Sequence, residues 1–124
     1  MIVALVDDLM FRSRIQTAAR GAGVDVRFVT TPDAAVRLIQ DHAPALVIAD
    51  LNAARIAPLQ VVAELKADPA LASTPIVGYV SHVDADTIAA ARAAGVDEVM
   101  ARSAFVMKLG EVLARDESSR GTEA

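Results

Sequence analysis

The sequence of 124 residues contains no cysteine and no tryptophan, and aromatic residues make up only 3% of it. The lack of cysteine excludes a disulfide scaffold, a thiol nucleophile and a cysteine-ligated zinc site. Basic residues are not concentrated either, since 12 Lys and Arg are interspersed with 16 Asp and Glu, for a formal net charge of −4. This balance argues against a nucleic-acid-binding surface, which needs clustered positive charge.

Long apolar runs are also absent. The first run, from Ile2 to Val6, stops at Asp7-Asp8 and has no basic segment before it, unlike a secretory signal peptide. No stretch approaches the roughly 18 apolar residues of a membrane-spanning helix. We therefore expect a cytoplasmic chain that does not contact a membrane. The sequence is 54% hydrophobic, which is enough for one domain with a substantial core.

Short apolar runs alternate with helix-like segments along the chain. The expected strands cover residues 2–6, 24–30, 45–49, 76–80 and 96–101. The expected helices cover residues 11–22, 32–43, 58–68, 85–94 and 103–115, with Ser103 as the N-cap of the last. Thr31 and Asp84 are suited to cap helices, and Gly95 is suited to end one. We expect one domain over residues 1–115 and a flexible tail over residues 116–124.

Five repeats of a strand followed by a helix favour a parallel sheet with helices on both faces. The strand order 2-1-3-4-5 is a common solution for such a chain. We therefore predict an α/β fold, a flavodoxin-like (βα)5 three-layer sandwich. Ligands bind such sheets beyond the carboxyl ends of the strands, at the point where the strand order reverses.

Acidic residues end the two strands that flank this point. Asp7-Asp8 follows the first strand and Asp50 follows the third, while Arg102 follows the fifth. Two carboxylates about 4 Å apart repel by roughly 4 kcal/mol at an effective dielectric of about 20, unless a cation neutralises them. Oxygen ligands favour Mg²⁺, and a carboxylate beside Mg²⁺ is suited to attack phosphorus. The alternative is structural, because Asp is common at strand ends and Asp8 is suited to cap the next helix.

Other catalytic and binding motifs are absent or misplaced. Gly21-Ala22-Gly23 precedes a strand, whereas a dinucleotide fingerprint follows one. The sequence has no Walker A loop, and Ser81-His82 lacks the glycines of a nucleophile elbow. The two histidines, His42 and His82, have no metal-ligand spacing.

Four segments carry a resemblance to a known family. They are Val6-Asp7-Asp8, Asp50-Leu51-Asn52, Pro75-Ile76-Val77 and Ala94-Gly95-Val96-Asp97-Glu98. In this order and spacing, the chain resembles the receiver domain of bacterial two-component response regulators over nearly its whole length. The resemblance implies that Asp50 accepts a phosphoryl group and that Asp8 and Asp50 ligate Mg²⁺ directly. It further implies that Asp7 acts through water and that Asn52 contributes its backbone carbonyl.

Several positions depart from the receiver pattern. Arg102-Ser103 stands where receivers have Lys-Pro, Val80 where they have Thr or Ser, and Val99 where they often have Tyr or Phe. Residues 53–57 replace the Met-Pro loop that follows the phosphoacceptor. Val80 has no hydroxyl to bond a phosphoryl oxygen, and Val99 has no ring to respond to that bond. Arg102 keeps the positive charge and is suited to pair bidentately with Asp50 in place of a phosphate.

The resemblance also implies partners rather than an enzyme, apart from self-phosphorylation from a phosphodonor. A histidine kinase or another signalling protein is expected to act on the domain. The output partner is expected in trans, on a face built from the Ala85–Ala94 helix, the fifth strand and the fifth helix, edged by Arg92 and Met107. The nearly all-alanine helix would give a smooth contact surface, and a homodimer is an alternative occupant.

Three functions stay open at this point. The first is an atypical stand-alone receiver, which acts through protein–protein contacts with weak or altered phosphorylation of Asp50. The second is a fully phospho-switched single-domain receiver that tolerates Arg102 and Val80. The third, of another class, is a flavodoxin-like small-molecule-binding domain. The departures favour the first function, and the retained acidic residues disfavour the third.

Overall fold

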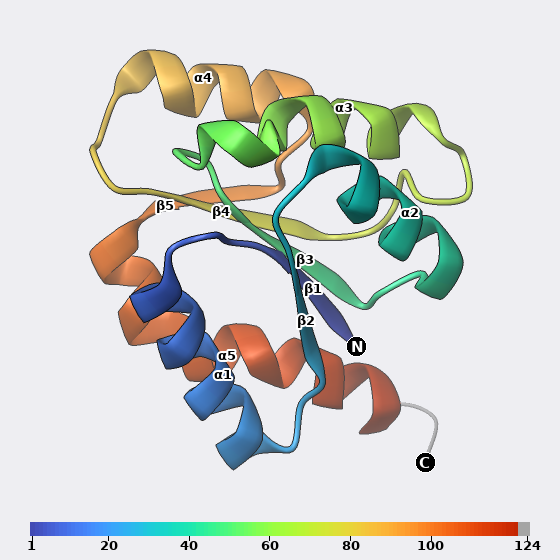
Figure 1. The fold of residues 1–124 in the computed structure, drawn as a ribbon, viewed down its shortest axis with the longest axis vertical. Helices are drawn as coiled ribbons and strands as arrows, with labels where there is room; N and C mark the ends of the chain where they lie inside the picture. Colours follow the sequence, from blue (N-terminus) through green and yellow to red (C-terminus); the bar gives the residue numbers. More distant parts are fainter. Residues whose placement is uncertain (122–124) are drawn as a thin grey trace.

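The computed structural model describes residues 1–121, with side chains through Asp116. The elements are β1 (Ile2–Leu5), α1 (Leu9–Ala22), β2 (Val26–Val29), α2 (Pro32–His42), β3 (Leu46–Asp50), a 3-10 turn η1 (Ala54–Ile56), α3 (Pro58–Ala67), β4 (Ile76–Val80), α4 (Ala85–Ala94), β5 (Glu98–Ala101) and α5 (Arg102–Gly121). The strands form one parallel sheet in the order β2-β1-β3-β4-β5, which confirms the predicted flavodoxin-like topology. Helices α1 and α5 cover one face, and α2, α3 and α4 cover the other (Figure 1).

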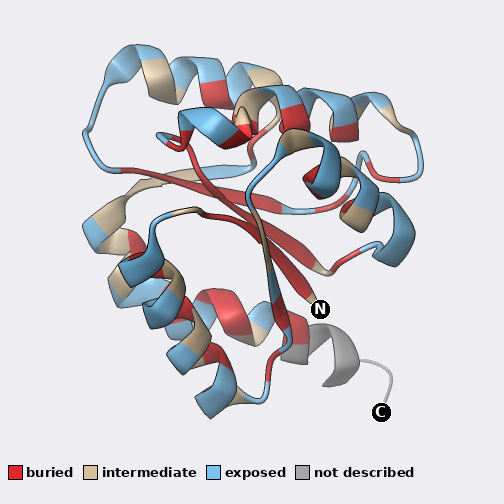
Figure 2. Ribbon diagram, viewed as in Figure 1, coloured by how far each residue is buried: buried red, intermediate tan, exposed pale blue. Residues whose placement is uncertain are grey.

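The central strands are buried on both faces, as Figure 2 shows by the red colour along the middle of the sheet. Every residue of β1, β3 and β4 is buried. A strand covered by helices on both sides needs a continuous apolar run rather than an alternating one. This is why these three strands are the ones most easily read from the sequence.

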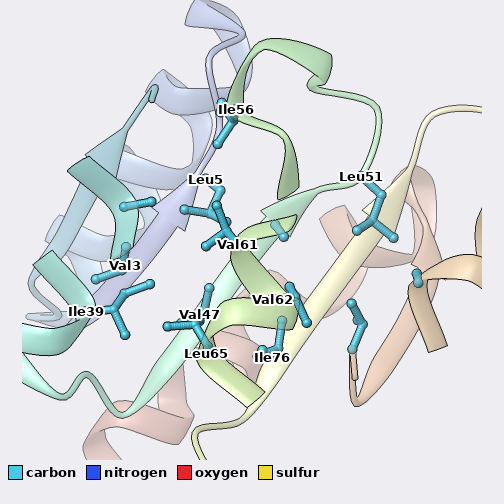
Figure 3. Packing of buried hydrophobic residues seen from close by; sticks show 14 of the residues in the cluster. Val3, Leu5, Ile39, Val47, Leu51, Ile56, Val61, Val62, Leu65 and Ile76 are labelled. Atoms are coloured by element: carbon cyan, nitrogen blue, oxygen red, sulfur yellow. The ribbon is translucent and has the colours of Figure 1, made fainter. Parts of the chain in front are cut away.

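The sheet separates two hydrophobic cores, because successive side chains of a strand point to opposite faces. Val47 and Ala49 of β3 belong to the core under α2, α3 and α4. Leu46 and Ile48 of the same strand belong to the core under α1 and α5. Figure 3 shows the first core, in which side chains of α3 pack over the sheet. The same alternation determines on which face of the sheet each side chain at the carboxyl ends of the strands lies.

Local sequence explains where the helices begin and end. The Asp8 side chain accepts a hydrogen bond from the Phe11 N–H at 3.0 Å and caps α1. Thr31 caps α2, and Asp84 caps α4, as the sequence predicts. Gly95 ends α4 in the left-handed region, with φ +116°, which confirms its predicted role.

The structure differs from the prediction at the two ends of α5. The helix begins at Arg102, directly after β5, so Ser103 lies inside the first turn and the prediction that it is the N-cap is wrong. At the other end the helix continues to Gly121 rather than ending near Arg115. Asp116 is buried and accepts a hydrogen bond from the Met1 amino group. The rest of the predicted flexible tail, residues 122–124, lies outside the described residues.

Smaller differences concern strand ends and the start of α1. Helix α1 begins at Leu9, two residues before the expected start, because Asp8 is its cap. Strands β2 and β5 are shorter than expected. Over residues 1–121, no helix combines the length and the apolar character needed to cross a membrane.

Candidate functional site

The loops that follow β1, β3, β4 and β5 meet at one edge of the sheet, on the left of Figure 1. Asp7 and Asp8 follow β1, Asp50 is the last residue of β3, and Arg102 is the first residue of α5. Because β1 and β3 are neighbours, their acidic ends lie beside each other. The parallel topology thus brings the predicted residues to one edge.

Asp50 is the most enclosed acidic residue of this edge, with 9% of its surface exposed. Its Oδ1 accepts a hydrogen bond from the Asn52 backbone N–H at 2.9 Å. Burial raises the pKa of Asp50, and the nearby charges of Asp7 and Asp8 raise it further. The Asn52 N–H and the Arg102 guanidinium act in the opposite direction, without cancelling the rise in pKa. Asp50 is therefore a partly desolvated carboxylate, fixed by the backbone and close to other charges.

The loop after Asp50 is clamped to the end of β4. The Asn52 side-chain oxygen accepts a hydrogen bond from the Ser81 N–H at 2.7 Å. Leu51 packs over Gly78, so closely that a Cβ on that glycine would lie 2.9 Å from Leu51 Cδ1. The Asn52 carbonyl, predicted to ligate Mg²⁺, accepts a hydrogen bond from the Ala54 N–H at 3.0 Å. These contacts hold the replacement loop in place without the Met-Pro pair.

Arg102 does not lie where the sequence suggested. Its Nη2 is 3.6 Å from Asp8 Oδ2, and its guanidinium carbon lies 4.4 Å from the centre of the Phe11 ring. Within the described residues, its only ion pair is with Asp8 and not with Asp50. The expectation that Arg102 takes the place of a phosphate on Asp50 is therefore not supported. The planar guanidinium lies instead over the aromatic face of Phe11, a contact that arginine often makes.

Val80 and Val99 pack in the core under α2, α3 and α4. Val80 is 1% exposed, and Val99 is partly buried. Asp50 instead shares the face of β3 that points toward α1 and α5, because it alternates with Ala49 along the strand. Neither valine brings a polar atom to the edge.

Tyr79 is the residue that sequence reasoning missed. It is the register partner of Asp50 in the neighbouring strand, and it is 1% exposed. Its hydroxyl has no hydrogen-bond partner among the described residues. The available signal was a single tyrosine in an otherwise apolar strand, one residue before Val80. The receiver pattern has its hydroxyl at the next position, that of Val80, and not at Tyr79.

The oxygen donors of this edge suit Mg²⁺ chemically, but their arrangement is not a preformed metal site. Among the side chains that the structure describes, those of residues 1–116, no group of three or more acidic or histidine residues is placed to hold a metal ion. Both oxygens of Asp8 have partners, since Oδ1 caps α1 and Oδ2 faces Arg102. The Arg102 guanidinium therefore neutralises part of the negative charge of Asp8.

A groove lies on the face that the sequence assigned to partners. It has a volume of about 400 Å³ between α4, β5 and α5, and both Arg92 and Arg115 line it. Arg115 Nη2 donates hydrogen bonds to both carboxylate oxygens of Glu98, at 2.9 and 3.1 Å. Met107 on α5 is 87% exposed. The face is thus more charged than the alanines of α4 suggested.

Comparisons with known proteins agree with this architecture. Residues 3–112 match the family model described as response regulator receiver domain. The structure is similar to a response regulator of Hahella chejuensis, with a TM-score of 0.81, 19% identity and 91% of each chain covered. It is also similar to the phosphorylated cyanobacterial phytochrome response regulator RcpA, with a TM-score of 0.81, 22% identity, and 95% of this chain and 94% of that one covered. The chemotaxis response regulator CheY4 of Vibrio cholerae gives a TM-score of 0.79 at 18% identity, covering 92% of this chain and 95% of that one. No curated protein matches the sequence significantly.

Proposed function

Since the chain belongs to the receiver-domain family of two-component response regulators, we propose that it is an atypical receiver with weak or altered phosphorylation at Asp50. We propose further that it acts through protein–protein contacts in the bacterial cytoplasm. Receiver domains are signalling domains rather than enzymes, and they interact with histidine kinases and other signalling proteins. Family membership favours this function over a flavodoxin-like small-molecule-binding domain.

The observation that carries the proposal is the position of Arg102. Its guanidinium is held by Asp8 and by the Phe11 ring, to one side of Asp50. A cation stabilises the charge that develops on a transferring phosphoryl group only when it is aimed at that group. The buried Val80 supplies no hydroxyl at the end of β4. Both features predict slower or weaker phosphorylation than an unmodified receiver would show.

Asp50 has the free carboxylate oxygen that phosphoryl transfer needs. Its Oδ1 is fixed by the Asn52 N–H, so that Oδ2 is the oxygen available to attack. In the proposed step a bond forms between Oδ2 and phosphorus, and the bond from phosphorus to the donor's nitrogen or oxygen breaks. The leaving group keeps the electron pair and takes up a proton. The protein itself acts only as the acceptor.

Receiver domains typically bind Mg²⁺, and we propose that Asp7, Asp8, Asp50 and the Asn52 carbonyl form a weak site for it. The support is their common edge and the electrostatic effect of Asp7 and Asp8 on Asp50. The Arg102 guanidinium competes with the metal for Asp8, because both positive charges favour the same carboxylate. Mg²⁺ affinity is thus expected to be low and to depend on Arg102.

We propose that the output partner binds the face formed by α4, β5 and α5. The groove between these elements, lined by Arg92 and Arg115, and the exposed Met107 support this choice. Arg and Met are both enriched at protein–protein interfaces relative to the rest of the surface. Introducing a negative charge by Ala90→Glu on the exposed surface of α4 is expected to weaken partner or homodimer binding, as measured by titration calorimetry or sedimentation.

The test of the proposed function is an amide NMR titration with Mg²⁺ and then with beryllofluoride, a phosphoryl mimic, on the wild type and on Arg102→Lys. We expect weak shifts near Asp8, Asp50 and Asn52 in the wild type, and stronger binding in the lysine variant. Shifts that spread to α4 with high affinity in the wild type would instead favour the fully phospho-switched alternative. No response of either protein to either addition would contradict phosphorylation at Asp50.

A further inference from the structure

Tyr79 has a buried hydroxyl for which the described part of the chain provides no hydrogen-bond partner. The side chain is 1% exposed, and its oxygen has no partner among the described residues. Buried polar atoms normally find a partner, since leaving one unpaired is costly. An orphaned hydroxyl on the residue paired with Asp50 in the neighbouring strand therefore requires an explanation.

The ring of Tyr79 is fixed by its packing. Its centre lies 4.8 Å from the ring of Phe11 and 4.8 Å from the ring of Phe105, which stacks on it at 25°. Phe11 in turn carries the Arg102 guanidinium on its face. The aromatic group thus connects β4 to α1, to α5 and to the charged edge of the sheet. A side chain held in this way cannot easily rotate its hydroxyl toward another acceptor.

The register places the side chains of Tyr79 and Asp50 on one face of the sheet. They are paired across β4 and β3, and Tyr79 packs in the core under α1 and α5. Val80, the next residue, points into the opposite core. Val80 lacks the hydroxyl that receivers have at its position. Tyr79, one residue earlier, carries a hydroxyl instead, and its side chain lies on the face where Asp50 lies.

The charges that act on Tyr79 are those of the site. Burial raises its pKa well above the ordinary value, and the negative charge of Asp50 raises it further. Arg102 acts in the opposite direction, and Asp8 and Asp7 add smaller effects that again raise the pKa. The phenol therefore stays protonated at all physiological pH values and keeps a proton to donate.

We infer that the Tyr79 hydroxyl donates a hydrogen bond to an oxyanion carried on Asp50, and so takes over the part of the hydroxyl that Val80 lacks. The oxyanion is a phosphoryl group or an analogue of the same shape and charge. Such a group extends beyond the carboxylate and would give the orphaned hydroxyl its acceptor. The inference rests on the proposed phosphorylation of Asp50.

The test exploits the composition, because Tyr79 is the only tyrosine and the chain has no tryptophan. Its near-ultraviolet absorption and fluorescence therefore report on this one hydroxyl. In the wild type we expect both spectra to change when beryllofluoride is added with Mg²⁺. In Asp50→Asn, which lacks the attachment point, we expect no such change.

The second measurement is the beryllofluoride affinity of Tyr79→Phe, which removes only the hydroxyl. A hydrogen bond to a charged group is strong, so its loss should weaken binding by about tenfold or more. The same substitution should not lower the midpoint of thermal unfolding, because it removes an unpaired buried polar atom. A purely structural role of Tyr79 would leave the affinity unchanged.

The outcomes separate the two proposals. If the wild type binds beryllofluoride but its tyrosine spectrum and the Tyr79→Phe affinity are both unchanged, the inference about Tyr79 is wrong and the proposed function stands. If the wild type does not bind beryllofluoride at any concentration tested, phosphorylation at Asp50 and the role of Tyr79 are overturned together.

Discussion

Arg102 carries its charge on a flat guanidinium whose position is set by Asp8 and by the ring of Phe11. Both side chains of the ion pair are about two-fifths exposed, at 40% and 43%. A solvent-exposed ion pair contributes roughly 0.2–1 kcal/mol, and an exposed cation–π contact roughly 0.5–1 kcal/mol. The guanidinium is therefore weakly held, and we expect a divalent cation to displace it.

Replacing Arg102 tests this competition. We expect Arg102→Ala to raise the affinity for Mg²⁺ about fivefold, since removing a charge about 4 Å from Asp8 changes the electrostatic energy by about 1 kcal/mol in water. The measurement is isothermal titration calorimetry at low salt. Arg12→Ala is the matched control, because Arg12 also stacks on a phenylalanine, with its guanidinium carbon 5.1 Å from the Phe28 ring centre. Equal affinities in the Arg102 variant and in this control would contradict competition for Asp8.

The residues of the site differ in how far the sequence predicts them. Asp7, Asp8 and Asp50 were predictable, because their position depends only on which strands they end. The stacking of Arg102 on Phe11 was not, because α1 and α5 meet only in the folded molecule. The same holds for the pairing of Tyr79 with Asp50, which depends on the register between β3 and β4.

At the scale of elements, both the backbone conformation and a close neighbour constrain Gly95, the glycine that ends α4. Gly95 has φ +116°, and a Cβ on it would lie 2.6 Å from Lys66 Cγ. Lys66 in turn donates hydrogen bonds to the carbonyls of Ala72 and Thr74, at 2.9 and 3.2 Å. The end of α4 thus packs against Lys66 of α3, whose amino group is bound to the connection between α3 and β4.

We therefore expect Gly95→Ala to lower the free energy of unfolding by about 1–3 kcal/mol, the usual cost of a strained backbone conformation. Gly110→Ala is the control, because Gly110 lies within α5 and a methyl group added to it would meet nothing within 4 Å. This second substitution should stabilise the protein by about 0.5–1 kcal/mol, since alanine is the better helix former. Urea denaturation measures both values, and the same sign for the two variants would refute the argument.

The elements themselves were predictable where a local signal exists. Thr31, Asp84 and Gly95 mark helix ends by chemistry that acts within a few residues. The start of α5 was mispredicted, because Ser103 has the side chain of a cap while the helix already begins at Arg102. At its far end the helix continues past Arg115 to Gly121, and the contact of Asp116 with Met1 joins residues from opposite ends of the chain, which no local pattern reveals.

At the scale of the whole molecule, the topology was predictable because five alternating strands and helices leave few arrangements. The sheet order then decides which loops share an edge, so the acidic site follows from the fold. The state of that site does not follow from the fold. It depends on the balance of burial, hydrogen bonds and charges around Asp50, which only the folded structure supplies.

The surroundings of Asp50 make the free energy of unfolding depend on pH. The pKa of Asp50 is raised in the folded protein, chiefly by burial, so the folded state disfavours the charged form. The resulting cost is present at neutral pH and disappears as the pH falls through the folded-state pKa. Asp50→Asn should therefore raise the melting temperature at pH 7, and this gain should shrink as the pH approaches about 4, where ordinary Asp side chains protonate.

Asp84→Asn provides a control of opposite sign. Hydrogen bonds from the Thr87 side chain and the Asp86 backbone lower the pKa of Asp84, so its charged form contributes stability above the unfolded-state pKa. The asparagine variant should melt below the wild type at pH 7, and the difference should vanish as the pH falls through the lowered pKa. Differential scanning calorimetry of the three proteins across this range measures both trends. A gain for Asp50→Asn that did not depend on pH would show that the substitution acts through packing rather than through the buried charge.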